Sequence, residues 1–133
     1  MSLRWYSIVV DCHDVKAQGH WWAEALGWKP IHETDDEIVI VPQRLTVDML
    51  GTTPWEQVPP CLVFGSVPEG KTTKNRLHID LAPHTSDDRD AEIDRLLRLG
   101  ATRVDVGQSG DESWDVFADP EGNEFCVLSS RDM

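Results

Sequence analysis

Short segments of alternating apolar and polar residues are spread along the chain, and two longer segments carry apolar residues at helical spacing. Residues 4–12, RWYSIVVDC, are rich in β-branched and aromatic side chains and predict a strand. Asp14 is suited to cap a helix, and Val15, Trp22 and Leu26 then form one apolar stripe. The pattern predicts a strand followed by a helix that ends near Leu26 and packs on a sheet.

Three further strands are predicted after this helix. Residues 28–33 and 37–43 are short apolar runs joined by a turn at 34–36, and residues 61–67 form the next run. Residues 43–59 contain Thr, Pro and Gly without a clear period, so we expect a loop there.

The order of strand, helix and three strands then recurs. Residues 76–82 predict a strand, and residues 87–100 predict a helix with Ile93, Leu96 and Leu97 at core spacing. Three more strands are expected at 102–107, 113–118 and 123–128. Leu-Gly closes each of the two helices, at Leu26-Gly27 and at Leu99-Gly100. This repeat indicates two tandem βαβββ units and an α+β fold.

The boundaries follow from the pattern. The polar and basic segment 68–75 is suited to link a first unit of about 4–67 to a second of about 75–129. At 133 residues the chain is long enough for a single domain, residues 1–133, with a core of its own. Asp119 to Gly122, DPEG, has the residues of a tight turn, so we expect a positive φ at Gly122.

The composition of the chain excludes some classes of binding partner and bears on its location. The chain has 24 acidic and 12 basic residues and a net charge of -12, which disfavours binding to nucleic acid or to an anionic membrane. Its three cysteines are widely spaced and odd in number, as expected for reduced thiols. Neither a membrane-length apolar run nor an export signal is visible, so we expect a cytoplasmic protein.

The two βαβββ units, WAEALGW at the end of the first helix and DPEGNEFCVL near the C-terminus resemble the vicinal oxygen chelate superfamily. Glyoxalase I, bleomycin-resistance proteins, fosfomycin-resistance enzymes and extradiol dioxygenases share this fold. The resemblance implies a curved, cup-like mixed sheet with helices on its outer face, and it points to a homodimer. It implies no single activity, because the superfamily includes isomerases, dioxygenases, transferases and proteins that only bind a drug.

In the enzymes of this superfamily four strand positions supply ligands to a divalent metal. Carried over to this chain, the positions fall on Ser7, near Gly65, on His78 and on Cys126. The usual occupants are His, Gln or Glu, and only His78 matches them. We therefore expect no complete metal site, and the sequence indicates no particular cofactor.

His78 is the most informative candidate residue. Strand alternation puts His78 and Asp80 on one face, and Leu77, Ile79 and Leu81 on the other, beneath the second helix. Three roles remain open for His78: a pocket-lining histidine whose ring is satisfied by the protein, a ligand in an unusual metal centre, or a general base that faces a ligand. We expect it to face the cup as the catalytic or ligand-contacting group.

Aromatic residues extend this candidate site. The chain has six tryptophans, and those near strand edges are suited to line a cup. The expected ligand-binding set is Ser7, His78, Asp80, Trp5, Trp114 and Cys126. Adjacent helical residues diverge by about 100 degrees, so Trp21 and Trp22 are not both expected in the core, which favours a homodimer. The cations of Lys71, Lys74 and Arg76 either hold a ligand carboxylate or solvate the linker, and we favour the linker.

These observations predict a glyoxalase-like protein that binds a small organic molecule and lacks the full superfamily metal site. One alternative is a metal-dependent or His-assisted lyase, isomerase or dioxygenase. Another is a drug-sequestering resistance protein, which the acidity and the tryptophan content favour through stacking and cation-π attraction.

Overall fold

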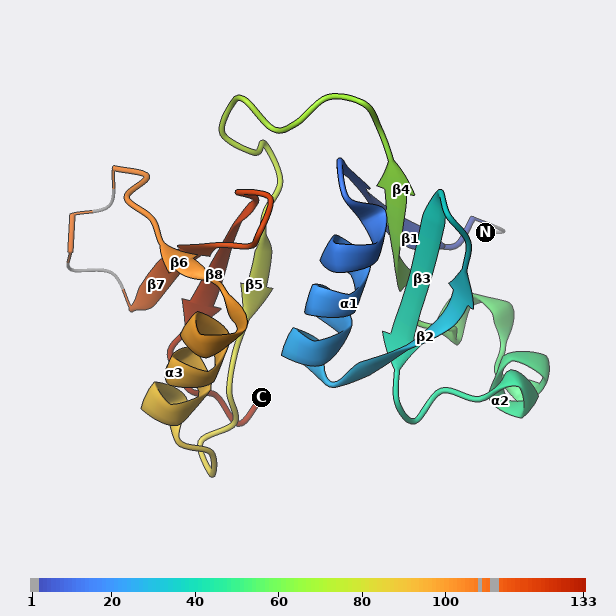
Figure 1. Cartoon of the computed structure of the whole chain (residues 1–133). Coiled ribbons are helices and arrows are strands. Elements are labelled where there is room, and N and C mark those ends of the chain that lie inside the picture. Colours follow the sequence, from blue (N-terminus) through green and yellow to red (C-terminus); the bar gives the residue numbers. More distant parts are fainter. Residues whose placement is uncertain (1–2, 108, 111–112) are drawn as a thin grey trace. The chain divides into compact units, whose positions relative to one another are not determined.

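The computed structural model describes residues 3–107, 109–110 and 113–133. The chain folds as two compact units, Met1–Gly70 and Lys71–Met133 (Figure 1). The boundary lies inside the segment that the sequence marks as a linker. Each unit, as far as its residues are described, contains a four-stranded mixed sheet and a helix of 11 or 12 residues.

Unit 1 begins with the predicted strand and helix. In chain order its elements are β1 (Ser7–Cys12), α1 (Val15–Leu26), β2 (Trp28–Glu33), β3 (Glu37–Pro42), α2 (Val47–Thr52), a 3-10 turn (Trp55–Gln57) and β4 (Cys61–Ser66). The strands are ordered β1-β4-β3-β2, with β1 and β4 parallel and the other pairs antiparallel.

Local chemistry sets the ends of α1. The Asp14 side chain accepts a hydrogen bond from the Ala17 amide at 3.2 Å, and Gly27 ends the helix with a φ of 66°. The helix contacts β2, β3 and β4. The strand residues that are buried on this face include Ile38, Ile40, Leu62 and Phe64. The apolar stripe thus places α1 against the sheet, as the spacing predicts.

One glycine makes this close packing of α1 on β3 possible. A Cβ atom at Gly19 would lie 2.9 Å from Cγ2 of Ile38, which is shorter than a normal carbon contact. Ile38 is fully buried and has no space into which to move. The approach of helix and sheet therefore requires a residue without a side chain at position 19.

Unit 2 repeats the order of unit 1. Its elements are β5 (Ile79–Leu81), α3 (Arg89–Leu99), β6 (Thr102–Arg103), β7 (Trp114–Ala118) and β8 (Glu124–Leu128). The strands are ordered β5-β8-β7-β6, with β5 and β8 parallel. Figure 1 shows α3 beside this sheet. The α+β fold of two βαβββ units is therefore confirmed.

Aromatic packing and one arginine stabilise unit 2. The rings of Phe117 and Phe125 stack with centroids 5.8 Å apart. Both phenylalanines are completely buried, and Ile93 and Leu96 of α3 are nearly so. Arg89, at the start of α3, donates hydrogen bonds to the carbonyls of β8 and to the Asp115 carboxylate. The arginine thus ties the helix to two strands of the sheet.

The turn between β7 and β8 forms as the sequence predicts. The Asp119 carbonyl accepts the Gly122 amide at 2.9 Å, and its carboxylate accepts the amides of Glu121 and Asn123 at 3.0 Å. Gly122 has a φ of 87°, which confirms the expected positive angle. A short hairpin therefore brings β8 back beside β7.

Several expectations from the sequence are wrong. The strands expected at 4–12 and 102–107 cover only Ser7–Cys12 and Thr102–Arg103. Residues 43–59 are not a plain loop, because the Thr46 side chain caps the helix α2. The strand in residues 76–82 is shorter than expected, and Leu77 is 86% exposed because the ladder with β8 starts only at Ile79. Trp21 and Trp22 are both buried, with their rings edge to face, so divergence by one helical step does not keep either out of the interior.

No helix in the described part of the chain is long and apolar enough to cross a membrane.

We predict that Gly19→Ala destabilises the protein. The new methyl group would overlap Ile38, and overpacking of a buried site costs about 1–3 kcal/mol, more than the helix propensity that alanine adds. Gly51→Ala is the matched control, because a Cβ at Gly51 in α2 meets nothing within 4 Å. Urea unfolding measures both. Equal stability of the Gly19 variant and the parent would show that α1 can move away from β3 at little cost.

Candidate functional site

A hollow in unit 2 collects most of the candidate residues. Its volume is about 440 Å³, and its polar residues include His78 and Asp80 at β5 and Cys126 on β8. The apolar part of the wall comes from Val106, Trp114, Val116 and Leu128. On β7 and β8 these lining residues alternate with the buried Phe117 and Phe125, so the hollow lies on the other face of the sheet.

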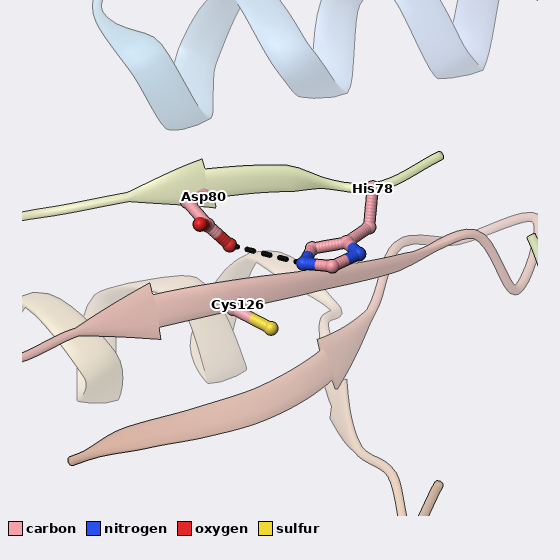
Figure 2. A group of neighbouring side chains, drawn as sticks. All are labelled: His78, Asp80 and Cys126. Atoms are coloured by element: carbon pink, nitrogen blue, oxygen red, sulfur yellow. Dashed lines mark ion pairs between the residues drawn. The ribbon is translucent and has the colours of Figure 1, made fainter. Parts of the chain in front are cut away.

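His78, Asp80 and Cys126 form one cluster within this hollow. Nε2 of His78 lies 3.2 Å from Oδ1 of Asp80, and the ligand atoms of all three residues lie within 4.8 Å of one another (Figure 2). Register explains the cluster, since Asp80 pairs with Cys126 across the parallel strands. The histidine and aspartate are about half exposed, whereas Cys126 is 6% exposed.

The thiol of Cys126 is held in its protonated form. Burial raises its pKa, and the negative charge of Asp80, to which the thiol is also hydrogen-bonded, raises the pKa further. A reactive cysteine needs the opposite environment, with cations or helix amides that stabilise the thiolate. Cys126 in this state is therefore a hydrogen-bond donor and a packing residue rather than a nucleophile.

The His78 and Asp80 pair has a different capacity. The carboxylate lies against one ring nitrogen of His78 and orients the imidazole, which leaves the other ring nitrogen for a ligand. An oriented imidazole can accept or donate one hydrogen bond and can also move a proton. The pair is thus equipped to recognise a hydroxyl or a carbonyl group at the mouth of the hollow.

Glu124, which lines the hollow, takes part in a largely buried ion pair with Lys71. Lys71 Nζ lies 2.9 Å from Oε1 of Glu124, both side chains are largely buried, and the Asn75 amide donates to Oε2. Lys71 therefore does not merely solvate the linker, and the expectation from the sequence is wrong for this residue. No sequence pattern signalled this pair, because its partners are far apart along the chain.

The charge state of Glu124 follows from these contacts. Burial opposes ionisation of this carboxyl group, but the hydrogen bonds from Lys71 and from the Asn75 amide, together with the charge of Lys71, outweigh it and lower the pKa of Glu124. Glu124 is therefore ionised at neutral pH.

The remaining candidate residues lie in unit 1. Ser7 lines a second hollow, of about 840 Å³, whose wall also includes Arg4, Tyr6 and Trp55. Trp5 is exposed and lies outside that lining, and its indole donates to the Ser7 carbonyl at 3.2 Å. The sequence interpretation overlooked Arg4 and Tyr6. Strand alternation would have placed both on the face opposite Ser7 and Val9, and they reach this hollow because β1 begins only at Ser7.

The donor set does not fit the hard, oxygen-loving ion of the superfamily enzymes. Ser7 offers at most a hydroxyl group, Gly65 offers no side chain, and Cys126 supplies sulfur where a carboxylate is usual. His78, Asp80 and Cys126 instead combine nitrogen, oxygen and sulfur, a set better matched to a softer ion such as zinc. These residues therefore do not fit a hard divalent ion.

Comparison with known proteins is consistent with the fold and decides the family. The model of the glyoxalase-like domain matches residues 7–128. The chain belongs to the glyoxalase-like domain family. This confirms the resemblance to the vicinal oxygen chelate superfamily. A search of curated proteins finds no match to this glyoxalase-like chain.

Solved structures share the fold of this glyoxalase-like chain at low identity. A glyoxalase/bleomycin resistance/dioxygenase family enzyme from Burkholderia phytofirmans PsJN is 13% identical, with a TM-score of 0.69 over 97% of this chain and 100% of the other. A mutant of the fosfomycin resistance protein FosX from Listeria monocytogenes, complexed with Mn(II), is 11% identical, with a TM-score of 0.67 over 98% and 92%. Oxidase ChaP-H2 is 20% identical, with a TM-score of 0.59 over 99% and 96%. At such identities the likeness shows the fold alone.

We predict that the Glu124 ion pair stabilises unit 2 in a pH-dependent way. The folded-state pKa of Glu124 is lowered from the ordinary 4.5, so its contribution is present above that value and is lost as the pH falls through the folded pKa. Glu124→Gln should therefore lower the free energy of unfolding at pH 7 by about 1.5–3 kcal/mol, the usual range for a hydrogen bond to a charged group.

The difference between this variant and the parent should shrink as the pH falls below 4.5. Urea unfolding of parent and variant at pH 7 and below pH 4.5 measures this difference. Glu69→Gln is the matched control, since Glu69 is exposed and carries the same charge. A difference that is equal at both pH values would contradict the electrostatic origin.

Proposed function

We propose that this glyoxalase-like chain binds a small organic molecule in the hollow of unit 2, with His78 as the polar group that contacts it. The observation that carries the proposal is the position of the oriented His78 and Asp80 pair beside an apolar and aromatic wall. A few convergent polar groups in a concave, otherwise apolar surface are the usual anatomy of a ligand site.

The lining supports a particular kind of ligand. Trp114 is partly exposed and presents an aromatic surface, which favours a flat molecule. The charges of the lining are mixed, because Lys74 and Arg131 lie in the same wall as Asp80 and Glu124. A neutral ligand with a hydroxyl or carbonyl group suits this wall better than a highly charged one.

A second candidate function is a metal-dependent lyase, isomerase or dioxygenase that uses a softer ion. The grouping of His78, Asp80 and Cys126 favours it, because these three atoms come from the residue types that bind zinc. The protonated thiol opposes it, since a thiol must lose its proton before it binds a metal.

Sequestration of a drug is a form of the first proposal in which no reaction follows binding.

Location and assembly stay predictions. The cytoplasmic location is the expectation from the sequence given above. The net charge of -12 disfavours nucleic-acid and anionic-membrane partners. A homodimer now rests on family resemblance alone, because both Trp21 and Trp22 are buried.

We predict that His78→Ala weakens ligand binding without unfolding the chain. Neutral hydroxy- and keto-aromatic fragments that bind the parent should shift the NMR signal of the Trp114 indole. Loss of the hydrogen bond between His78 and the bound fragment should raise the Kd of these fragments roughly tenfold. His84→Ala is the matched control, because His84 is exposed in the same unit and lies outside the lining. Equal affinity of the His78 variant and the parent would contradict the proposal.

Metal titration separates the two candidate functions. The first predicts that cobalt(II) added to chelator-treated protein produces no thiolate-to-metal absorption band. A band that Cys126→Ala removes, and that Cys61→Ala in unit 1 retains, would instead establish the metal centre. Ultraviolet absorption of the parent and the two variants at equal concentration is the measurement.

A further inference from the structure

The hollow in unit 1 is a second concave surface with its own chemistry. It has a volume of about 840 Å³ and is lined by residues on β1, β3 and β4 that alternate with the residues beneath α1. Val9, Ile31 and Leu50 are large apolar residues of this lining that are exposed. Concentrated exposed apolar surface inside a hollow is typical of a binding site.

A single arginine is held between two aromatic rings in this hollow. The guanidinium carbon of Arg4 lies 4.5 Å from the ring centroid of Tyr6 and 4.2 Å from that of Trp55. The two rings are themselves neighbours, with centroids 6.3 Å apart. Contact with ring faces fixes the plane of the guanidinium group and leaves its edge, where the N–H donors lie, for another partner.

The donors of Arg4 are not satisfied by the protein itself. Its Nε atom is buried without a hydrogen-bond partner, and among the described residues no ion pair with a carboxylate includes Arg4. This is unexpected in a chain with 24 acidic residues. A donor that finds no partner within the protein is unfavourable, and an acceptor from outside the chain would satisfy the guanidinium group.

We propose that the hollow of unit 1 binds an organic monocarboxylate with a flat, apolar body. The carboxylate accepts hydrogen bonds from the edge of the Arg4 guanidinium group, a geometry that suits two parallel bonds. The apolar body lies over Val9, Ile31 and Leu50 and against the exposed surfaces of Tyr6 and Trp55.

The surrounding charges select a single negative charge. Arg4 is the only arginine or lysine in this lining as described, and Glu37 lies in the same wall, 3.7 Å from Nε2 of His32. A dianion such as a phosphate ester would meet Glu37 and the net charge of -12, which disfavour a second negative charge. A cation would be repelled by Arg4. An apolar monocarboxylate satisfies the arginine without further cost.

The test compares naphthoate with naphthamide, which has a similar flat body and no charge. We expect naphthoate to bind the parent protein more tightly than naphthamide does and to shift the NMR signals of Tyr6, Val9, Leu50 and the Trp55 indole. Arg4→Gln should raise the Kd of naphthoate roughly tenfold and leave that of naphthamide unchanged, because only the charged hydrogen bonds are lost. Arg44→Gln removes the same charge from an exposed position of unit 1 outside the lining and should change neither value.

The proposal is overturned if naphthoate does not bind the parent at millimolar concentration, if naphthamide binds as tightly, or if the shifts are confined to unit 2. It is also overturned if the properly folded Arg4→Gln variant binds naphthoate like the parent. Arg4→Lys is the second variant, in case the glutamine variant fails to fold. It keeps the charge but loses the planar fork, and we expect it to bind naphthoate with intermediate affinity.

Discussion

The constraint on which the rest of the structure depends is that each sheet has two faces and each unit has one long helix to cover them. In unit 1 the helix α1 takes the face that carries Ile38, Ile40, Leu62 and Phe64. The other face of the same strands is left to line a hollow. Unit 2 follows the same rule, with Phe117 and Phe125 on the buried face and the hollow on the other. The candidate sites of this chain therefore lie on the sheet faces that the long helices do not cover.

The two hollows differ because different polar residues lie among their apolar positions. The hollow of unit 2 contains a carboxylate, an imidazole and a protonated thiol that interact with one another. The hollow of unit 1 contains a guanidinium group that lies between two aromatic rings. Interacting polar groups are suited to hydrogen bonds with a neutral ligand, whereas an arginine without an acceptor is suited to an anion. The same fold can thus present two chemistries from two copies of one supersecondary pattern.

Family membership determines less than these local arrangements. The solved structures that share the fold of this chain include a fosfomycin resistance protein and an oxidase. Their likeness lies in backbone geometry, while chemistry depends on a few side chains at the hollow. The resemblance implies that Cys126 and a position near Gly65 correspond to metal-ligand positions of superfamily enzymes. Neither residue supplies the nitrogen or oxygen donor that a hard ion prefers, although both lie in regular strands.

The sequence by itself determined the two βαβββ units, the caps at Asp14 and Gly27 and the turn at Gly122, because these depend on residues close together along the chain. It also placed His78 and Asp80 on one face through strand alternation. The resemblance to the superfamily already grouped Cys126 with them. Only the tertiary structure decided that Lys71 pairs with Glu124 and that Arg4 lies between Tyr6 and Trp55. Those contacts join segments that are far apart along the chain. They depend on strand register and on loop positions, which packing determines and local propensity does not.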